Sequence, residues 1–416
     1  MYESFGTDKF DDLYVRYESD ESIPKSTIGA QEFILDLLKE RAETGRIYIM
    51  NIDHCNTHSS FKDQIFMSNL CQEITLPTYP ISHIDDHLGE ISLCILSAVN
   101  VGKIRNDEEL EDLCDLSVRA LEELIDYQEY PVVAAERATK ARRSLGVGFI
   151  GLAHYLAKLG FNYNSQEAWD AVHGLSESFQ YYLLKASNEI AKEKGHCSDF
   201  GRTKYADGIL PIDTYKRDVD DICGQELQHD WDSLRASITE YGLRHSTLSA
   251  QMPSESSSVV SNATNGIEPP RDYLSIKKSK KGPLKQVVPS YASLKNNYTL
   301  LWEMQNNDGY IKIVAVMQKF FDQAISGNWS YNPENYPDNE VPVSVMANDL
   351  LTTYKYGWKT SYYQNTHDMK SDDEPAHPIG WHDNVEEVGI QGKTKLPTLL
   401  NELSSSEEGE CESCAI

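Results

Sequence analysis

The chain has 416 residues, of which 40% are hydrophobic and 25% are charged. This length and composition allow a sizeable core, in one large domain or a few ordinary ones, and exclude a globally disordered chain. Asp and Glu number 65 against 38 Lys and Arg, which gives a net charge of −27. A surface this acidic repels nucleic-acid phosphates and anionic lipid headgroups, so nucleic-acid binding and attachment to a membrane through basic residues are disfavoured as functions.

The sequence also predicts a cytoplasmic location. No apolar run approaches the ~20 residues that span a bilayer, and residues 1–11 are polar and acidic, without the apolar stretch of a signal peptide. The 8 cysteines are scattered except for one pair at the C-terminal end. In a chain that is not exported, this usage favours buried or reactive thiols over a disulfide framework.

Helices are expected in chain order where apolar residues recur at helical spacing. The first includes residues 33–38, and residues 46–52 then alternate as a strand does. Residues 54–104 lack a helical period and indicate loops and short strands. Asn106, with a glutamate three residues later, is a capping pair that opens the next helix. Later helices are expected near residues 134–159, 166–194 with an interruption at Gly174, 229–241, 310–326 and 342–356.

Short apolar stretches between these helices, such as residues 243–249 and 358–363, favour an α/β fold over an all-helical one. From about residue 368 the composition changes to Asp, Glu, Ser and Pro and the periodicity ends, which is typical of a flexible tail. We therefore predict a helical lead-in and strand over residues 1–53, a main domain over residues 54–368 and an acidic tail over residues 369–416.

Two motifs resemble ligand sites but favour a structural interpretation. Residues 146–151 match G-x-G-x-x-G. A dinucleotide site requires a strand before this motif and a second strand after it, but residues 134–144 look helical and no second strand follows. Close helix packing is the preferred explanation. His54, Cys55 and His58 lie as close together as zinc ligands can, but no second ligand pair lies at zinc-finger spacing. We expect no metal site in this chain.

A stronger chemical signal lies in residues 69–73. If the chain is extended there, Asn69, Cys71 and Glu73 point to the same side. A thiol would then be flanked by an amide, which can orient hydroxyl groups, and by a carboxylate, which can accept a proton. The alternative is an edge strand with exposed polar groups.

Three further features are weak when each is taken alone. A turn rich in hydroxyl groups can hold phosphate oxygens, paired tyrosines usually pack, and a terminal CxxC is either half of a zinc site or a redox dithiol. The residues concerned are Ser254, Glu255, Ser256 and Ser257 in the turn, Tyr362 and Tyr363 in the pair, and Cys411 and Cys414 in the CxxC.

Taken together and in order, these motifs resemble the large, catalytic subunit of class I ribonucleotide reductase, of the aerobic bacterial and phage type. The resemblance extends from the first residues to about residue 368 and resumes at Cys411. The shared words are GRIYI and DHCNTH within residues 45–58, SNLC at 68–71, LPT at 76–78, GEISLC at 89–94, MPSE at 252–255, SNATNGIEPPR at 261–271 and YYQNT at 362–366.

The resemblance implies a role for each site residue. Cys71 would carry the thiyl radical that abstracts the ribose 3′ hydrogen, Glu73 would take the proton of the 3′-OH, and Asn69 would hold the ribose hydroxyls. Cys94 would be one of two thiols that reduce the 2′ position of the ribonucleoside diphosphate. Ser254, Glu255, Ser256 and Ser257 would receive the substrate diphosphate; Ser256 stands where relatives commonly carry Thr.

The resemblance also implies partners and no cofactor bound in this chain. Tyr362 and Tyr363 would relay a radical from a small subunit with a dinuclear metal–tyrosyl centre, and that relay argues against the cobalamin-dependent class of the same barrel. Cys411 and Cys414 would re-reduce the active-site disulfide and pass the oxidation to thioredoxin or glutaredoxin. Such an enzyme would be an oxidoreductase of deoxyribonucleotide biosynthesis for DNA replication.

The implied fold is a ten-stranded α/β barrel in two five-strand halves, with the Cys71 finger loop inserted through its centre. This chain would supply that loop, the second half of the barrel and the flexible C-terminal tail. The N-terminal half, with the thiol that pairs with Cys94, would be another polypeptide in a split large subunit; a shortened form of a longer chain is the second interpretation. A non-catalytic remnant that binds the small subunit is the alternative function, disfavoured because Asn69, Cys71, Glu73 and Cys94 are all present.

Overall fold

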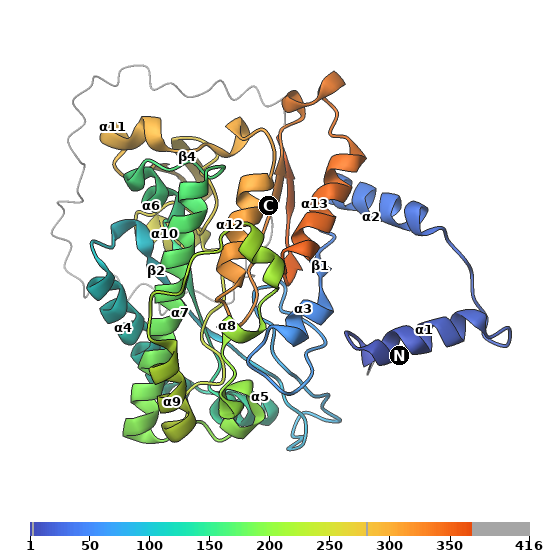
Figure 1. Cartoon of the computed structure of the whole chain (residues 1–416), viewed down its shortest axis with the longest axis vertical. Helices are drawn as coiled ribbons and strands as arrows, with labels where there is room; N and C mark the ends of the chain where they lie inside the picture. The colour runs from blue at the N-terminus through green and yellow to red at the C-terminus, as the bar shows by residue number, and fades with distance from the viewer. Residues whose placement is uncertain (2–3, 280–281, 368–416) are drawn as a thin grey trace. The chain divides into compact units, whose positions relative to one another are not determined.

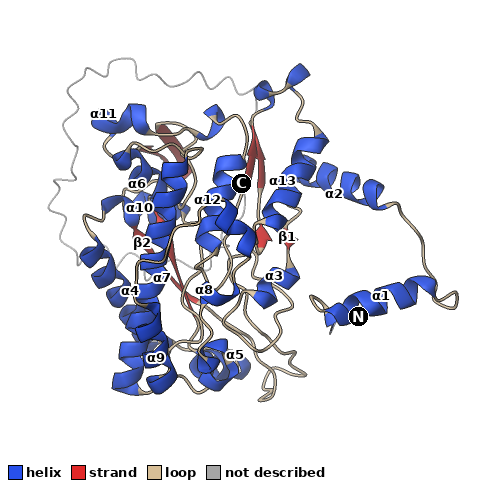
Figure 2. Cartoon of the chain, in the orientation of Figure 1, coloured by secondary structure: helices blue, strands red, loops and turns tan. Residues whose placement is uncertain are grey.

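The computed structural model describes residues 1, 4–279 and 282–367, and it combines helices with short strands (Figures 1 and 2). The helices are α1 (Asp8–Ser19), α2 (Ala30–Thr44), α3 (Ile52–Thr57), α4 (Asp107–Tyr127), α5 (Val133–Arg142), α6 (Leu152–Leu159), α7 (Gln166–Lys194), α8 (Pro211–Thr214), α9 (Trp231–Tyr241), α10 (Glu255–Val260), α11 (Tyr291–Leu294), α12 (Asp308–Gln318) and α13 (Val343–Lys355). The strands are β1 (Ile49–Met50), β2 (Ile95–Asn100), β3 (Leu145–Ile150), β4 (Leu274–Ser279), β5 (Gly282–Val287), β6 (Trp329–Tyr331), β7 (Thr360–Ser361) and β8 (Gln364–Thr366). The predicted tail lies outside the described residues.

A parallel backbone ladder runs through the centre of the fold. β2 pairs with β3 in parallel, from Ile95 opposite Leu145 to Asn100 opposite Ile150. Parallel bridges then join β3 to residues 247–251, and those residues to residues 323–326. Residues 323–326 lead into β6 and form one segment with it, and β6 pairs in parallel with β8, the fifth and last segment of the ladder. The mixed α/β prediction is therefore confirmed, while short antiparallel pairs, β1 with β7 and β4 with β5, lie beside the ladder.

β3 explains the glycine-rich motif and corrects the prediction of one helix over residues 134–159. Alternate residues of the strand, Leu145, Val147 and Phe149, are fully buried in the hydrophobic core, so the segment is covered as a central parallel strand is. Gly146 and Gly148 point to the opposite face, where an added Cβ at position 148 would lie 2.6 Å from the carbonyl oxygen of Ala250. The two glycines therefore leave one face of β3 without side chains, and close helix packing is not the reason for the motif.

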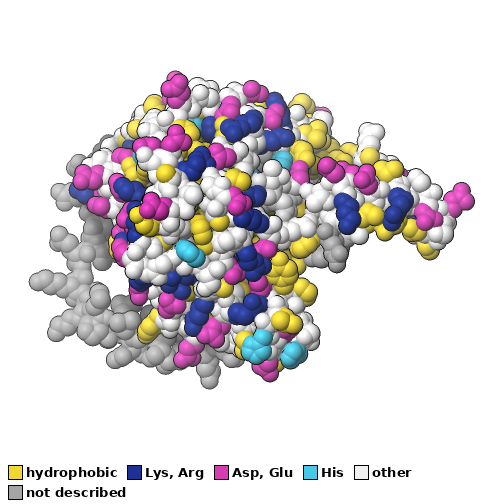
Figure 3. Space-filling model, turned by 60° about the horizontal axis from the view of Figure 1, so that its bottom comes forward, with side chains coloured by type: hydrophobic (Ala, Val, Ile, Leu, Met, Phe, Trp, Pro, Cys, Tyr) yellow, Lys and Arg dark blue, Asp and Glu magenta, His cyan; other side chains and the backbone are white. Residues whose placement is uncertain are grey.

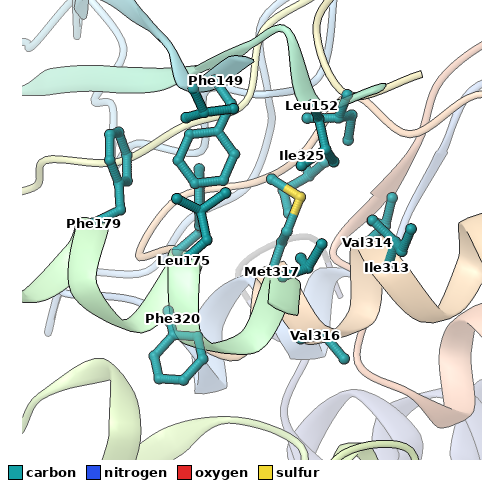
Figure 4. Close-up of a cluster of buried hydrophobic side chains, with 14 of the residues drawn as sticks. Phe149, Leu152, Leu175, Phe179, Ile313, Val314, Val316, Met317, Phe320 and Ile325 are labelled. Carbon is teal, nitrogen blue, oxygen red and sulfur yellow. The ribbon is translucent and has the colours of Figure 1, made fainter. Parts of the chain in front are cut away.

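Two long helices, α4 and α7, pack against each other and cover the ladder. α4 begins as predicted, with the Asn106 side chain accepting a hydrogen bond from the Glu109 N–H at 2.9 Å. α7 runs unbroken over 29 residues, so the predicted interruption at Gly174 is wrong. Cys114 is buried in this core, where the thiol behaves as a small hydrophobic group. Figure 4 shows the centre of the cluster, where Phe149 faces residues of α7 and α12.

The helix predicted over residues 310–326 ends at Gln318, because the residues after it turn back into the ladder. Asp322 is 3% exposed and its carboxylate accepts hydrogen bonds from Thr247 Oγ1 at 2.8 Å, from the N–H groups of Leu248 and Ser249 at 2.9 Å, and from Tyr205 OH at 2.7 Å. A buried carboxylate needs such donors to replace water. These hydrogen bonds stabilise the turn. A helix that continued beyond Gln318 could not form that turn.

The surface carries charges of both signs. Figure 3 shows acidic and basic side chains interspersed over the face that it presents. No helix within the described ranges combines the length and the apolarity that crossing a membrane requires.

Replacing Asp322 by Asn tests the importance of this turn. The amide keeps one acceptor oxygen but places an NH2 group against donors, so we expect Asp322→Asn to lower the free energy of unfolding by about 2 to 4 kcal/mol. Urea denaturation of the full chain measures the change. Asp207→Asn is the control, because Asp207 is an exposed partner of Lys62, and it should cost less than about 0.5 kcal/mol. Equal effects of the two substitutions would contradict the prediction.

Candidate active site

Residues 69–74 form a tight turn, so the extended conformation considered from the sequence does not occur there. The Asn69 N–H donates to the Ile74 carbonyl at 3.2 Å, and the Ile74 N–H donates to Asn69 Oδ1 at 3.1 Å. Gln72 takes a left-handed conformation with φ 67° to close the turn. The amide of Asn69 nevertheless reaches Glu73, because its side chain forms a hydrogen bond with that carboxyl group. The three polar residues are therefore gathered by a turn and not by strand alternation.

Glu73 is a buried carboxyl group at the base of this turn, only 3% exposed. Ser326 Oγ donates to Glu73 Oε2 at 3.3 Å, and the Ala324 N–H donates to the Glu73 carbonyl at 3.0 Å. Burial raises the pKa of Glu73, and the hydrogen bonds from Asn69 and Ser326 oppose that rise. A carboxylate with a raised pKa is a stronger base than an exposed one.

Cys71 contacts a tyrosine from the other end of the chain. Tyr362 OH lies 3.3 Å from Cys71 Sγ, and Ser326 Oγ donates to the Cys71 carbonyl. Tyr362 is 3% exposed, and burial together with the neighbouring thiol raises its pKa. At neutral pH the phenol therefore keeps its proton and presents an O–H to the sulfur.

Three tyrosine rings form one cluster beside Cys71. The ring centroids of Tyr362 and Tyr363 are 4.1 Å apart, and Tyr48 lies 4.7 Å from Tyr362 and 5.5 Å from Tyr363. The Tyr48 hydroxyl is hydrogen-bonded to both of the others, and burial raises its pKa to about 12. Tyr48 has no predicted role in the sequence, although its place in the alternating segment before β1 is a signal that could have identified it.

Cys94 lies at the amino end of the ladder, directly before β2. Its thiol accepts a hydrogen bond from Gln323 Nε2 at 3.5 Å. Burial raises the pKa of Cys94, the hydrogen bond from Gln323 lowers it, and the charges of Glu73 and Asp322 raise it further. Gly146 leaves room for the sulfur, because an added Cβ there would lie 3.0 Å from Cys94 Sγ.

The hydroxyl-rich turn lies at the opposite, carboxyl end of the ladder, after residues 247–251. Ser254 is buried and donates to the Met252 carbonyl at 3.2 Å. Glu255, Ser256 and Ser257 form the exposed first turn of α10. Cys411 and Cys414 lie outside the described residues.

The histidines of the possible zinc motif bind protein groups. His58 contacts Thr214 Oγ1 at 2.9 Å through Nδ1 and the Gln318 carbonyl at 2.7 Å through Nε2. His54 Nδ1 contacts the Trp358 carbonyl at 3.0 Å. Within the described ranges, no group of three or more His, Cys, Asp or Glu side chains is arranged to hold a metal ion.

Comparison with known proteins decides the family. The sequence-family model of the ribonucleotide reductase barrel domain matches residues 1–296 and 291–364. The chain belongs to the ribonucleotide reductase family. The ribonucleoside-diphosphate reductase subunit alpha of Haemophilus influenzae is 58% identical over 377 residues, which cover 89% of this chain and 50% of that protein. The corresponding subunit 1 alpha of Escherichia coli is 55% identical over 377 residues, with the same coverage.

A more distant relative is covered to a similar extent. Subunit alpha of Enterobacteria phage T4 is 42% identical over 375 residues, which cover 88% of this chain and 49% of that protein. The chain thus spans about half the length of the curated relatives that it matches.

Gly146→Ala tests whether the face of β3 that carries the glycines makes space for the Cys94 thiol. The new Cβ would meet Leu96 Cδ2 at 2.6 Å as well as Cys94 Sγ. We expect a loss of about 1 to 3 kcal/mol in the free energy of unfolding and a slower reaction of Cys94 with iodoacetamide, followed by peptide mass spectrometry. Gly201→Ala is the control, because nothing lies within 4 Å of its added Cβ. Unchanged Cys94 reactivity in Gly146→Ala would contradict the prediction.

Proposed function

We propose that this chain is the C-terminal catalytic part of a ribonucleoside-diphosphate reductase large subunit, which reduces ribonucleoside diphosphates to 2′-deoxyribonucleoside diphosphates by a radical reaction. One observation carries the proposal. In a chain of this family, the Tyr362 hydroxyl contacts the Cys71 thiol, and Ser326 Oγ donates both to the Cys71 carbonyl and to the buried carboxyl group of Glu73.

Cys71 is the proposed radical carrier. The hydrogen-bonded Tyr362 OH provides a path for a hydrogen atom, because a tyrosyl radical that takes the hydrogen of the Cys71 thiol leaves a thiyl radical and a restored phenol. The thiyl radical then abstracts the 3′ hydrogen of the ribose. Tyr363 continues the path outward, toward a small subunit that generates the radical at a dinuclear metal–tyrosyl centre. The ring contact of 4.1 Å between Tyr362 and Tyr363 supports this step.

Glu73 and Asn69 are the proposed acid–base and orienting groups. The raised pKa of Glu73 suits it to take the 3′-OH proton, and the hydrogen bond to Asn69 fixes the carboxylate orientation. Asn69 is exposed on the turn, where its amide can reach ribose hydroxyls. Ser254, Glu255, Ser256 and Ser257 are the proposed receivers of the substrate diphosphate.

Cys94 is the proposed reductant of the 2′ position, together with a second thiol. The two thiols supply two electrons and two protons as the 2′-hydroxyl leaves as water, and they become a disulfide. Cys411 and Cys414 then restore the dithiol and are themselves reduced by thioredoxin or glutaredoxin. We place the second thiol in the N-terminal part of the large subunit, because the chain spans about half the length of its relatives.

The N-terminal part is the proposed partner that completes the barrel. The ladder supports this, since its five parallel segments end at β2, whose outer edge has no strand partner among the described residues. In this proposal the ladder is the second half of a ten-stranded barrel and the 69–74 turn is the tip of its finger loop. The complex is expected to work in the cytoplasm, and this chain alone is expected to show no reductase activity.

Cys71→Ser tests the radical carrier. An alkoxyl radical at serine is energetically inaccessible, so turnover in the complex with the N-terminal part and the small subunit should fall by more than about a thousandfold. Deoxyribonucleotide formation from radiolabelled ribonucleoside diphosphate measures it. Cys223→Ser is the control, since a serine there can keep the hydrogen bond to Asp170 and should retain activity. Appreciable turnover by Cys71→Ser would rule out this role, and an inactive complex with the unmodified chain would favour the non-catalytic remnant.

Tyr362→Phe tests the relay and separates it from packing. The ring remains to pack while the O–H that contacts Cys71 is lost, so turnover should fall by more than about a hundredfold. Binding of the small subunit, measured by surface plasmon resonance, should persist. The control is Tyr298→Phe, which removes a buried hydroxyl bonded to the Pro289 carbonyl outside the cluster. If Tyr362→Phe abolished binding together with turnover, the tyrosine pair would serve packing.

A further inference from the structure

The turn formed by residues 321–326 contacts both cysteines of the site and the carboxyl group of Glu73. Gln323 donates to Cys94 Sγ, and Ser326 donates to the Cys71 carbonyl and to Glu73. The turn therefore sets where these three groups lie relative to one another. The proposed function assigns no role to the Gln323 side chain.

The amide of Gln323 is fixed in one orientation. Its side chain is completely buried, and Nε2 donates to the Leu145 carbonyl at 2.9 Å as well as to Cys94 Sγ at 3.5 Å. The first bond identifies the NH2 side of the amide, so the second N–H is directed at the sulfur. Because the sulfur accepts this bond, the hydrogen of the Cys94 thiol must point away from Gln323.

The backbone beneath Gln323 is held as firmly as its side chain. Lys359 is 1% exposed, and its Nζ donates to the carbonyls of Phe321, Asp322 and Gln323 at 3.3, 2.9 and 2.8 Å. Gln318 Nε2 donates to the Gln323 carbonyl as well, at 2.9 Å. The backbone of Gln323 cannot move away from Cys94 without breaking these buried hydrogen bonds, and the side-chain amide cannot rotate away without breaking its bond to the Leu145 carbonyl.

We propose that Gln323 is a positioning residue for the reducing thiol: its Nε2–H holds Cys94 Sγ and stabilises the thiolate form. The inference rests on the proposed role of Cys94 as reductant. The electrostatics of the site agree with it. Burial raises the pKa of Cys94 most, the hydrogen bond from Gln323 lowers it, and the charges of Glu73 and Asp322 raise it further. Gln323 therefore offsets the two carboxylates that disfavour a negative sulfur.

The reaction of Cys94 with iodoacetamide tests the proposal without requiring turnover. The thiolate is the reactive form, and peptide mass spectrometry follows Cys94 separately from the other cysteines. The experiment uses the full chain, expressed with the N-terminal part, between about pH 7 and pH 9.5. Gln323→Met keeps a similar volume but loses the donor, and Gln323→Glu replaces the donor by a negative charge. We expect Gln323→Met to react about threefold to tenfold more slowly than the unmodified chain, and Gln323→Glu to react more slowly still.

Gln318→Met is the matched control, because it removes a buried amide that supports the same turn but does not contact Cys94. A merely structural role of Gln323 predicts equal effects of Gln318→Met and Gln323→Met, and that result would overturn the proposal. So would an unchanged rate in Gln323→Met, or equal rates in the Met and Glu variants. Failure of the proposed function is a separate result: Cys94→Ser would then leave turnover of the complex intact, whatever the alkylation rates are.

Discussion

The site depends on a buried charge arrangement at the turn that follows α12. Asp322 draws the N–H groups of residues 248 and 249 toward its carboxylate, and Lys359 draws three successive carbonyls toward its ammonium group. Burial lowers the pKa of Lys359 to about 7, and the neighbouring Cys55 thiol and Asp322 carboxylate oppose that fall. Asp322 and Lys359 both anchor residues 321–323, and the side chains that contact the two cysteines, Gln323 and Ser326, belong to the same backbone segment.

In the proposed mechanism, two kinds of chemistry take place on neighbouring segments. One-electron transfer would use tyrosine hydroxyls in contact, and the cluster of Tyr48, Tyr362 and Tyr363 lies beside Cys71. Two-electron reduction would use the Cys94 thiol, which lies directly before β2. The carboxyl group of Glu73 accepts a hydrogen bond from Ser326, which also donates to the Cys71 carbonyl. The burial and the raised pKa of Glu73 follow from its position beneath the turn and not from any nearby negative partner.

Much of the site could be predicted from the sequence, because its residues occur in local words such as SNLC and YYQNT. Their geometry could not. The strand β3 lies inside a segment for which the apolar pattern predicts a helix. A parallel strand that is covered on both faces has no alternation of polar and apolar residues that would reveal it. The contact between Gln323 and Cys94 joins residues 229 positions apart, and no local pattern announces it. Tyr48 was missed for the same reason, because its partners lie near the other end of the chain.

The face of β3 that carries the glycines has an evolutionary consequence. Every missense change of a glycine codon adds at least a Cβ atom, and at positions 146 and 148 that atom would meet Cys94 or the backbone of Ala250. A substitution at either position would bring the added Cβ too close to the Cys94 thiol or to the backbone of the ladder. Substitution at these two positions is therefore constrained by the space between neighbouring segments of the ladder and the Cys94 thiol.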